Sequence, residues 1–240
     1  MKLGIIGNPV SHSQSPKLFA ELCPGQGTYD KIEEPDFEKA YARFLSDYDA
    51  VNVTMPFKEL AYYKCKPDSD AVRTIKAVNI LKKEGDKVVG YNSDYLGVRD
   101  ILEKDGAAGK SLLVVGCGGA AKAAAVAAVD AGCKVAMTNR SYEKCYSFVR
   151  HSNLDIDVLE LKDVSLARFE YVIYAIPAPL EELSGWNFAG KRVLEANYAN
   201  PCLSGRVVAD GGEYIEGIVW LRAQAVAGFR IMLLTLPDIE

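Results

Sequence analysis

The chain has 240 residues, of which 49% are hydrophobic and 25% are charged, and its formal net charge is −4. This composition provides the apolar material for one large domain or two modest ones. An acidic balance without a basic tract argues against nucleic acid as a partner. The longest apolar run, 123–129, is too short to cross a bilayer, so we expect no membrane partner.

The cysteines form no Cys-x-x-Cys pair and have no metal-like spacing with the two histidines, His12 and His151. We therefore expect no metal and interpret them as free thiols of a reducing cytoplasm. The N-terminus has one lysine and a brief apolar strand, which does not fit a secretion signal. The six cysteines are Cys23, Cys65, Cys117, Cys133, Cys145 and Cys202.

Strands and helices alternate in the first half of the sequence. Strands are predicted at Lys2–Ile6, Thr28–Glu33 and Ala50–Thr54, and helices at Pro16–Leu22, Phe37–Leu45 and Asp68–Lys76. Ala77–Lys82 and Lys87–Tyr91 are predicted to form a hairpin, because a glycine-containing turn separates them. A helix from Asp94 to about Lys104 follows, and we place a domain boundary near 95.

The second half repeats the alternation with more apolar strands. Strands are predicted at 112–115, Cys133–Thr138, Ile156–Leu159, Tyr171–Ala175 and Arg192–Ala196, and helices at Gly119–Ala131, Tyr142–His151 and Gly217–Leu234. The last helix is apolar over most of its face, so it fits either domain. The pattern predicts an α/β fold with two domains and a cleft between them: an N-terminal α/β substrate domain and a C-terminal Rossmann-type dinucleotide-binding domain.

A glycine-rich turn follows the apolar strand 112–115. Gly116 allows a tight turn, Gly118 lets the backbone approach a pyrophosphate, and Ala121 keeps helix and strand close. The exposed N–H groups at the start of such a helix hold phosphates. Because many helices begin after a glycine turn for packing alone, both interpretations stay open at this point.

Two cations and no carboxylate follow the next predicted strand. The chain reads Asn139-Arg140-Ser141 there, with Lys144 one turn along the next helix. A cofactor with a free ribose 2′-hydroxyl usually meets Asp or Glu at this position. A guanidinium pairs with phosphate in bidentate fashion, so these cations favour a 2′-phosphate and predict NADP as the cofactor. The alternative is an ordinary solvated face.

Hydroxyl groups gather before the first predicted helix, in the segment SHSQSP at 11–16. Pro16 suits the first helical position and Ser15 suits the cap before it. The same hydroxyls also suit a carboxylate ligand, because the dipole and N–H groups of a helix N-terminus favour an anion. The two interpretations are compatible.

Thr54 and Lys58 lie just past the strand 50–54, where α/β proteins place their ligands, although a lone lysine is usually a surface charge. Further on, Ser93 or Asp94 fits the cap of the following helix. Alternatively, Asp94 lies near Lys58 across the cleft. Such a pair passes a proton to a substrate oxygen while a nicotinamide delivers hydride to the carbon.

Six motifs occur in a fixed order along the chain: SxSP at 13–16, NVTxPFK at 52–58, AVN at 77–79, NSDxxG at 92–97, the turn from Gly116, and NRS at 139–141. Together they resemble the shikimate dehydrogenase family, from residue 4 to about 230. The resemblance implies a cytoplasmic enzyme of aromatic amino acid (chorismate) biosynthesis. In that family the reaction is the reversible, NADP-dependent reduction of 3-dehydroshikimate to shikimate.

The resemblance also implies roles at matching positions. Lys58 and Asp94 match the catalytic pair, with Lys58 holding the developing alkoxide. Ser13 and Ser15 match residues that bind the substrate carboxylate. The other implied substrate-binding residues are Thr54, Asn79, Asp94, Tyr198 and Gln224. The implied cofactor-binding residues are Gly116, Gly118, Gly119, Ala120, Asn139, Arg140, Ser141, Lys144 and Gly217.

Family architecture further implies that the last helix, about 217–240, packs on the N-terminal domain 1–95, leaving 96–216 as the NADP-binding domain. The chain departs from the family pattern on the nicotinamide side of the site. Ile80 stands where Thr is usual, Tyr174 replaces a common Asn, Glu195 stands for Asp, and one extra residue precedes Pro201.

Two alternative functions stay open. One is an enzyme whose true substrate is quinate or another shikimate-like diol acid. The other is a catalytically silent NADP-binding module that senses redox state or regulates a partner. The sequence is compatible with a monomer or a homodimer.

Overall fold

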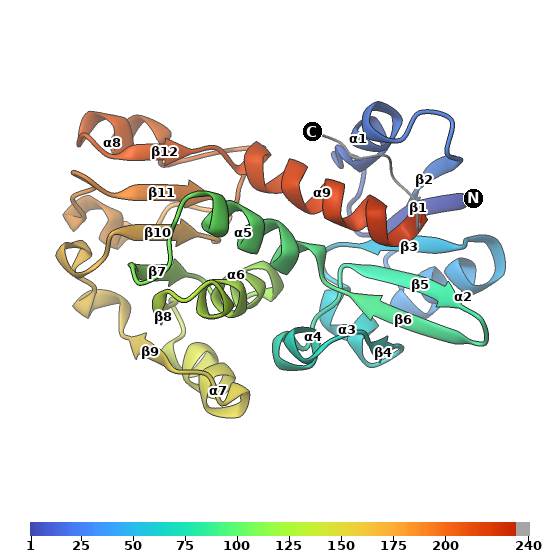
Figure 1. The fold of residues 1–240 in the computed structure, drawn as a ribbon, viewed down its shortest axis with the longest axis horizontal. Coiled ribbons are helices and arrows are strands. Elements are labelled where there is room, and N and C mark those ends of the chain that lie inside the picture. Colours follow the sequence, from blue (N-terminus) through green and yellow to red (C-terminus); the bar gives the residue numbers. More distant parts are fainter. Residues whose placement is uncertain (234–240) are drawn as a thin grey trace. The chain divides into compact units, whose positions relative to one another are not determined.

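A computed structural model describes residues 1–233, which form two compact units (Figure 1). The first unit contains residues 1–93 and 224–233, and the second contains residues 94–223. The predicted domain limits near 95 and 217 stay predictions. No helix in the described part of the chain is long and apolar enough to cross a membrane.

The first unit is built on a six-stranded sheet with the order β2-β1-β3-β5-β6-β4. β1 pairs in parallel with β2 and β3, whereas β5 is antiparallel to both β3 and β6. Its elements are β1 (Lys2–Gly7), α1 (Ser15–Leu22), β2 (Thr28–Glu33), α2 (Phe37–Asp47), β3 (Ala50–Val53), α3 (Lys58–Tyr62), β4 (Lys66–Pro67), α4 (Asp70–Ile75), β5 (Ile80–Glu84) and β6 (Lys87–Tyr91).

Side-chain alternation along β1, β2 and β3 gives this sheet two apolar faces. On one face, Phe44 of α2 packs with Ile32 and Val51 in a buried cluster. On the other, the rings of Phe19 and Tyr29 have centroids 5.2 Å apart. Phe229 of α9 (Gly217–Leu233) lies 5.3 Å from Phe19 and 5.9 Å from Tyr29. The last part of α9 therefore belongs to the core of the first unit.

A local signal explains the start of α2. Asp36 begins α2 because its carboxylate accepts hydrogen bonds from the N–H groups of Glu38 and Lys39. The predicted hairpin is confirmed, but its turn is the two residues Gly85 and Asp86, and its first strand begins at 80 and not at 77. The short elements α3 and β4 were not predicted, because five- and two-residue segments have no readable periodicity.

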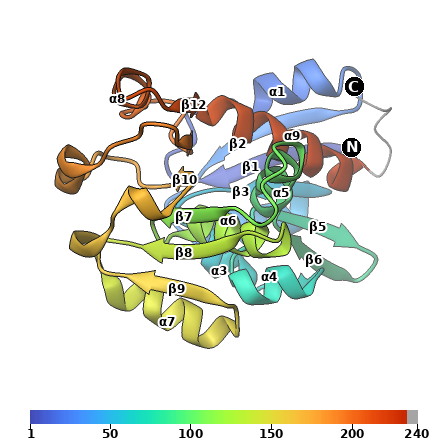
Figure 2. The ribbon, with the colours of Figure 1, turned by 60° about the vertical axis from the view of Figure 1, so that its left-hand side comes forward.

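The second unit is a fully parallel six-stranded sheet with the order β12-β11-β10-β7-β8-β9, the doubly wound arrangement of dinucleotide-binding folds. Figure 2 shows β10, β7, β8 and β9 side by side, with α7 at the β9 edge. The main elements are α5 (Ser93–Lys104), β7 (Ser111–Val115), α6 (Gly119–Asp130), β8 (Lys134–Thr138), α7 (Tyr142–Ser152), β9 (Ile156–Leu159), β10 (Tyr171–Tyr174), β11 (Arg192–Glu195), α8 (Ser204–Ala209) and β12 (Glu213–Ile215).

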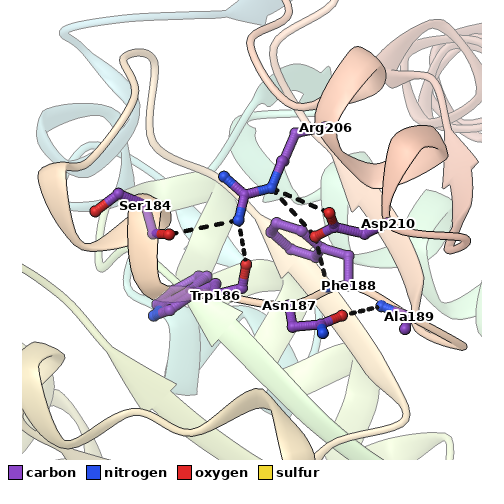
Figure 3. Close-up of polar contacts among 7 residues, drawn as sticks. All are labelled: Ser184, Trp186, Asn187, Phe188, Ala189, Arg206 and Asp210. Carbon is purple, nitrogen blue, oxygen red and sulfur yellow. Dashed lines mark hydrogen bonds and ion pairs between the residues drawn. The ribbon is translucent and has the colours of Figure 1, made fainter.

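One guanidinium holds the irregular segment before β11 (Figure 3). Arg206 of α8 donates hydrogen bonds to the carbonyl oxygens of Trp186, at 2.7 Å, and Ser184, at 3.4 Å. Asp210 pairs with Arg206 and accepts from the N–H of Phe188 at 3.0 Å, which lowers the pKa of the Asp210 carboxyl. The side chains of Trp186 and Phe188 are thereby buried in the core of this unit.

Lys82 of β5 is a buried cation in the first unit. Its residue is only 4% exposed, and its Nζ donates to the carbonyl oxygen of Ile231 at 2.6 Å. Ile231 lies in the last turn of α9, where helix carbonyls lack intrahelical partners. Burial lowers the pKa of Lys82 below its usual value, while Glu84, at 3.9 Å, acts in the opposite direction.

The free energy of unfolding of the wild type should rise with pH in the alkaline range. Lys82→Met is expected to reduce this rise. The folded protein releases the Lys82 proton below pH 10.5, the usual pKa that an unfolded chain retains. The unfolded state then binds more protons in the interval below 10.5, so the free energy of unfolding rises with pH there. Urea unfolding between about pH 8 and 10.5 measures the rise.

The matched control is Lys87→Met, at an exposed lysine of β6, which should keep the wild-type pH dependence. A K82M protein whose free energy of unfolding follows that of the wild type across this range would contradict the assignment.

Candidate functional site

The carboxyl ends of β1, β3 and β6 lie at one edge of the first sheet. β1 and β3 are parallel, and β6 runs in the same direction because β5 is antiparallel to both β3 and β6. The same edge contains the start of β5. The connecting segments 8–15, 54–58, 77–79 and 92–93 therefore gather at the edge where α/β folds place their ligands.

Close backbone approach joins the loop after β1 to the loop after β3. The N–H of Asn8 donates to the carbonyl of Met55 at 3.0 Å. A Cβ atom at Gly7 would collide with the Thr54 side chain and come within 2.9 Å of Val10 Cγ1. Glycine at position 7 is therefore what allows Thr54, a predicted substrate-binding residue, to lie where it does.

The two predicted serines lie together at the start of α1, but the predicted cap is wrong. Ser15 is the first residue of α1, and Gln14 occupies the cap position without a side-chain bond. The Ser13 hydroxyl instead accepts from the Ser15 N–H at 3.2 Å, so the helix begins one residue earlier than expected. The Ser15 side chain hydrogen-bonds to Tyr29, whose pKa is raised by burial.

A chain of hydrogen bonds continues inward from Tyr29. Its hydroxyl donates to Asn52 Oδ1 at 2.6 Å, and Asn52 Nδ2 donates to the Asn79 carbonyl at 3.2 Å. Asn79 Nδ2 donates to Ser93 Oγ, and Ser93 Oγ donates to Gln224 Oε1, each at 3.0 Å. This set of five residues, the polar chain, joins two predicted substrate-binding residues that are 145 positions apart, Asn79 and Gln224.

Three members of the polar chain were not predicted as site residues. Asn52 had a visible signal, because it is a polar residue inside a buried strand. The sequence predicts only a helix cap at Ser93, whereas its hydroxyl lies between Asn79 and Gln224. Tyr29 had no signal, since its partner lies on a strand that is not its neighbour in the sheet.

Gly228 of α9 allows Gln224 to approach Ser93. A Cβ at Gly228 would lie 3.1 Å from Ile80 Cδ1 and 3.2 Å from Ser93 Oγ. Ile80, which departs from the family pattern, thus packs against the backbone of α9. Ile80 therefore has a structural role in this unit, because its side chain contacts the helix that carries Gln224.

Ser93→Ala should lower the free energy of unfolding by about 1–3 kcal/mol, because it removes the hydroxyl that accepts from the buried Asn79 Nδ2 and donates to Gln224 Oε1. Urea unfolding measures the difference. Ser46→Ala is the matched control: Ser46 is exposed and its hydroxyl bonds only the nearby Arg43 carbonyl in the described structure. Equal stability of S93A and S46A would show that the polar chain contributes little.

Lys58 is the first residue of α3 and is half-buried. Its carbonyl accepts from the Val78 N–H at 3.0 Å, which fixes its backbone beside the segment that carries Asn79. Asp94 and Tyr198 belong to the second unit. Asp94 is buried, and its carbonyl accepts from Trp220 Nε1 at 3.1 Å. That Asp94 meets Lys58, and that Tyr198 binds the substrate, stay predictions.

In the second unit, the glycine turn joins β7 to α6 at the point where the strand order reverses, between β7 and β10. Gly116 has φ +125°, which favours glycine, and a Cβ there would lie 3.3 Å from the Ala175 carbonyl oxygen. Gly118 occupies the N-cap position of α6 and, as a glycine, makes no side-chain hydrogen bond there. A Cβ at Gly118 would meet no atom within 4 Å, so the backbone there is open to a ligand.

The cations that follow β8 are available to a ligand. Arg140 and Lys144 are exposed, and neither makes a hydrogen bond or an ion pair through its side chain with any residue in the range 1–233. Asn139 Nδ2 donates to the Ser141 carbonyl at 3.2 Å, and Ser141 is the N-cap of α7. Because β8 is the neighbour of β7, these cations follow the strand next to the glycine turn.

Tyr174 on β10 and Glu195 on β11 both depart from the family pattern, and both hydrogen-bond to the loops that follow these strands. Tyr174 is fully buried, and its hydroxyl donates to the Ala178 carbonyl at 2.8 Å. Glu195 is also fully buried and accepts from the N–H groups of Cys202, at 2.7 Å, and Leu203, at 3.0 Å. The longer acidic side chain thus fastens the loop that carries the extra residue.

Gly217 has a packing role that its predicted cofactor role did not include. A Cβ there would lie 2.6 Å from the Glu195 carbonyl oxygen and 2.8 Å from that of Ala196. Only glycine lets the start of α9 approach β11 this closely. Among residues 1–233, no group of three or more His, Cys, Asp or Glu side chains could hold a metal ion.

Comparison with known proteins agrees with this fold. Residues 5–81 match the family model of the shikimate dehydrogenase substrate binding domain. A shikimate dehydrogenase (NADP(+)) of Caldicellulosiruptor saccharolyticus is 38% identical over 182 residues, covering 71% of this chain and 64% of that protein. Its counterpart in Syntrophobacter fumaroxidans is 35% identical over 173 residues, covering 69% and 59%. The matched segments thus span less than two thirds of the length of these relatives.

A crystal structure of shikimate dehydrogenase from Aquifex aeolicus superimposes with a TM-score of 0.86 at 26% identity, covering 99% of this chain and 94% of the other. The fold and the glycine turn define the class: a two-unit α/β protein with a Rossmann-type sheet. Within that class, the chain is similar in sequence and in fold to these shikimate dehydrogenases.

Proposed function

We propose that this protein catalyses the reversible, NADP-dependent reduction of 3-dehydroshikimate to shikimate in aromatic amino acid biosynthesis. The observation that carries the proposal is the polar chain, which joins Asn79 to Gln224 at the strand edge that also carries Thr54 and Lys58. The relatives named shikimate dehydrogenase (NADP(+)) support the same activity.

In this proposal, the first unit supplies most of the residues that bind the substrate. The hydroxyls of Ser13 and Ser15 bind its carboxylate at the start of α1, where backbone N–H groups favour an anion. Thr54, Asn79, Asp94 and Gln224 bind the ring hydroxyls, and Tyr198 lines the site. The polar chain fixes the amides of Asn79 and Gln224 before the substrate arrives, which reduces the entropy lost on binding.

Lys58 and Asp94 carry the chemistry. The Lys58 ammonium stabilises the negative charge that develops on the carbonyl oxygen, and Lys58 and Asp94 together deliver the proton that completes the alcohol. Bound NADPH supplies the hydride for the carbonyl carbon. In the oxidative direction, the same pair removes the proton from the hydroxyl group.

The second unit binds NADP. The turn that contains Gly116, Gly118, Gly119 and Ala120 suits a pyrophosphate at the start of α6, as in other doubly wound folds, because the space around Gly118 is open. The exposed Arg140 and Lys144, with Asn139 and Ser141 beside them, suit the 2′-phosphate. Gly217 contributes by letting α9 start close to β11. The six free cysteines support a cytoplasmic location.

The test is shikimate-dependent formation of NADPH by the purified protein, followed by absorbance. Lys58→Ala should lower turnover by about 100-fold or more, with little change in substrate affinity, because the lost ammonium acts mainly on the developing charge. Lys39→Ala, at an exposed lysine of α2, is the matched control and should keep wild-type turnover.

Near-normal turnover of K58A would remove Lys58 from the mechanism. Faster turnover of quinate than of shikimate by the wild type would replace the proposed substrate. NADP binding without turnover of either acid would favour the regulatory module.

Arg140→Ala should weaken the binding of NADP much more than that of NAD, because only NADP has a 2′-phosphate for the guanidinium. Calorimetric titration of both cofactors measures the two changes. Arg150→Ala, at an exposed arginine in the last turn of α7, is the matched control. If R140A weakens NADP and NAD equally, the 2′-phosphate site is wrongly assigned.

A further inference from the structure

Two thiols meet beneath the glycine turn of the second unit. Cys117 lies between Gly116 and Gly118 and is half-exposed, whereas Cys145 of α7 is fully buried. The Cys145 thiol is hydrogen-bonded to the Cys117 side chain and lies 3.9 Å from the Gly116 carbonyl oxygen. The proposed reaction uses neither thiol, yet the pair connects the turn to α7, the helix that carries Lys144.

The two thiols have different surroundings. The hydrogen bond with Cys117, together with burial, raises the pKa of Cys145, which therefore stays a protonated thiol. Cys117 is the accessible partner, and it precedes the N-terminus of α6, where the helix dipole favours a thiolate. Lys122, in the first turns of α6, adds positive charge close to the pair. Cys117 is thus the thiol that meets an oxidant first.

We propose that Cys117 and Cys145 form an oxidative modification site, at which a peroxide converts the two thiols into a disulfide. The Cys117 thiolate attacks one peroxide oxygen and the O–O bond breaks, which gives a sulfenic acid and a hydroxide. The hydroxide takes up the proton that the Cys117 thiol released and becomes one water. The Cys145 sulfur then attacks the sulfenic sulfur, loses its proton and displaces a second water. Two sulfurs are oxidised and hydrogen peroxide is reduced to two waters.

The disulfide changes the shape of the turn. Its sulfurs must approach to about 2.05 Å, well inside the separation of hydrogen-bonded thiols. Cys145 is enclosed in the core, so the half-exposed Cys117 must move, and its neighbours Gly116 and Gly118 move with it. This consequence rests on the proposed function, in which that backbone holds the pyrophosphate. Oxidation should then weaken NADP binding by about 10-fold or more.

Mass spectrometry tests the bond by itself. After treatment with hydrogen peroxide and blocking of the remaining thiols, trypsin should release peptide 111–122 linked to peptide 145–150, each of which contains one cysteine. Dithiothreitol should separate them. Oxidised protein without this linked pair, or with Cys117 only in higher oxidation states, would overturn the proposal.

Calorimetric titration of NADP tests the consequence. Affinity should fall on oxidation, return with dithiothreitol, and stay unchanged by peroxide in Cys145→Ser, with Cys145→Ala as a second variant should the first fold poorly. Cys133→Ser is the matched control and should respond like the wild type. A linked pair with undiminished affinity would overturn the regulatory effect. Reduced protein that binds no NADP would overturn the proposed function, while the linked peptides still decide the thiol pair.

Discussion

Buried polar groups must be hydrogen-bonded, and in the first unit this constraint shapes the candidate site. The side chains of Asn52, Asn79 and Ser93 are almost fully buried, and each has its partners within the polar chain. None of them can turn toward another partner without leaving an amide or hydroxyl group unpaired. The chain therefore fixes the orientation of Asn79 and Gln224, and through Gly228 it requires α9 to lie against β5.

A different constraint acts in the second unit, where backbone segments approach each other closely. Gly116 adopts a conformation that favours glycine, and Gly217 lies so near β11 that no side chain fits. At Gly118 the opposite holds, because the space above it is open. The three glycines thus differ in their surroundings, and only the open space at Gly118 points directly to a ligand. The buried acid Glu195 and the Arg206 guanidinium fasten the loops around this sheet.

Much of the fold could be predicted because its signals are local. The apolar strand 112–115, the glycine turn and the alanine-rich α6 are adjacent in the sequence, and their geometry follows from backbone preferences alone. The elements that were missed, α3, β4, α8 and β12, have two to six residues each, too few to show a period. The predicted cap at Ser15 is wrong because two hydroxyls lie within three residues, and the hydroxyl of Ser13 accepts from the Ser15 N–H.

The sequence by itself determined the class of fold, the glycine turn, the cations at 140 and 144, and the positions that match shikimate dehydrogenases. Those features depend on residues that are neighbours in the chain. Tertiary structure alone decided that Tyr29, Asn52 and Ser93 join the polar chain and that Cys117 meets Cys145. Each of these contacts joins distant segments, and strand order and register, which local preferences do not specify, bring them together.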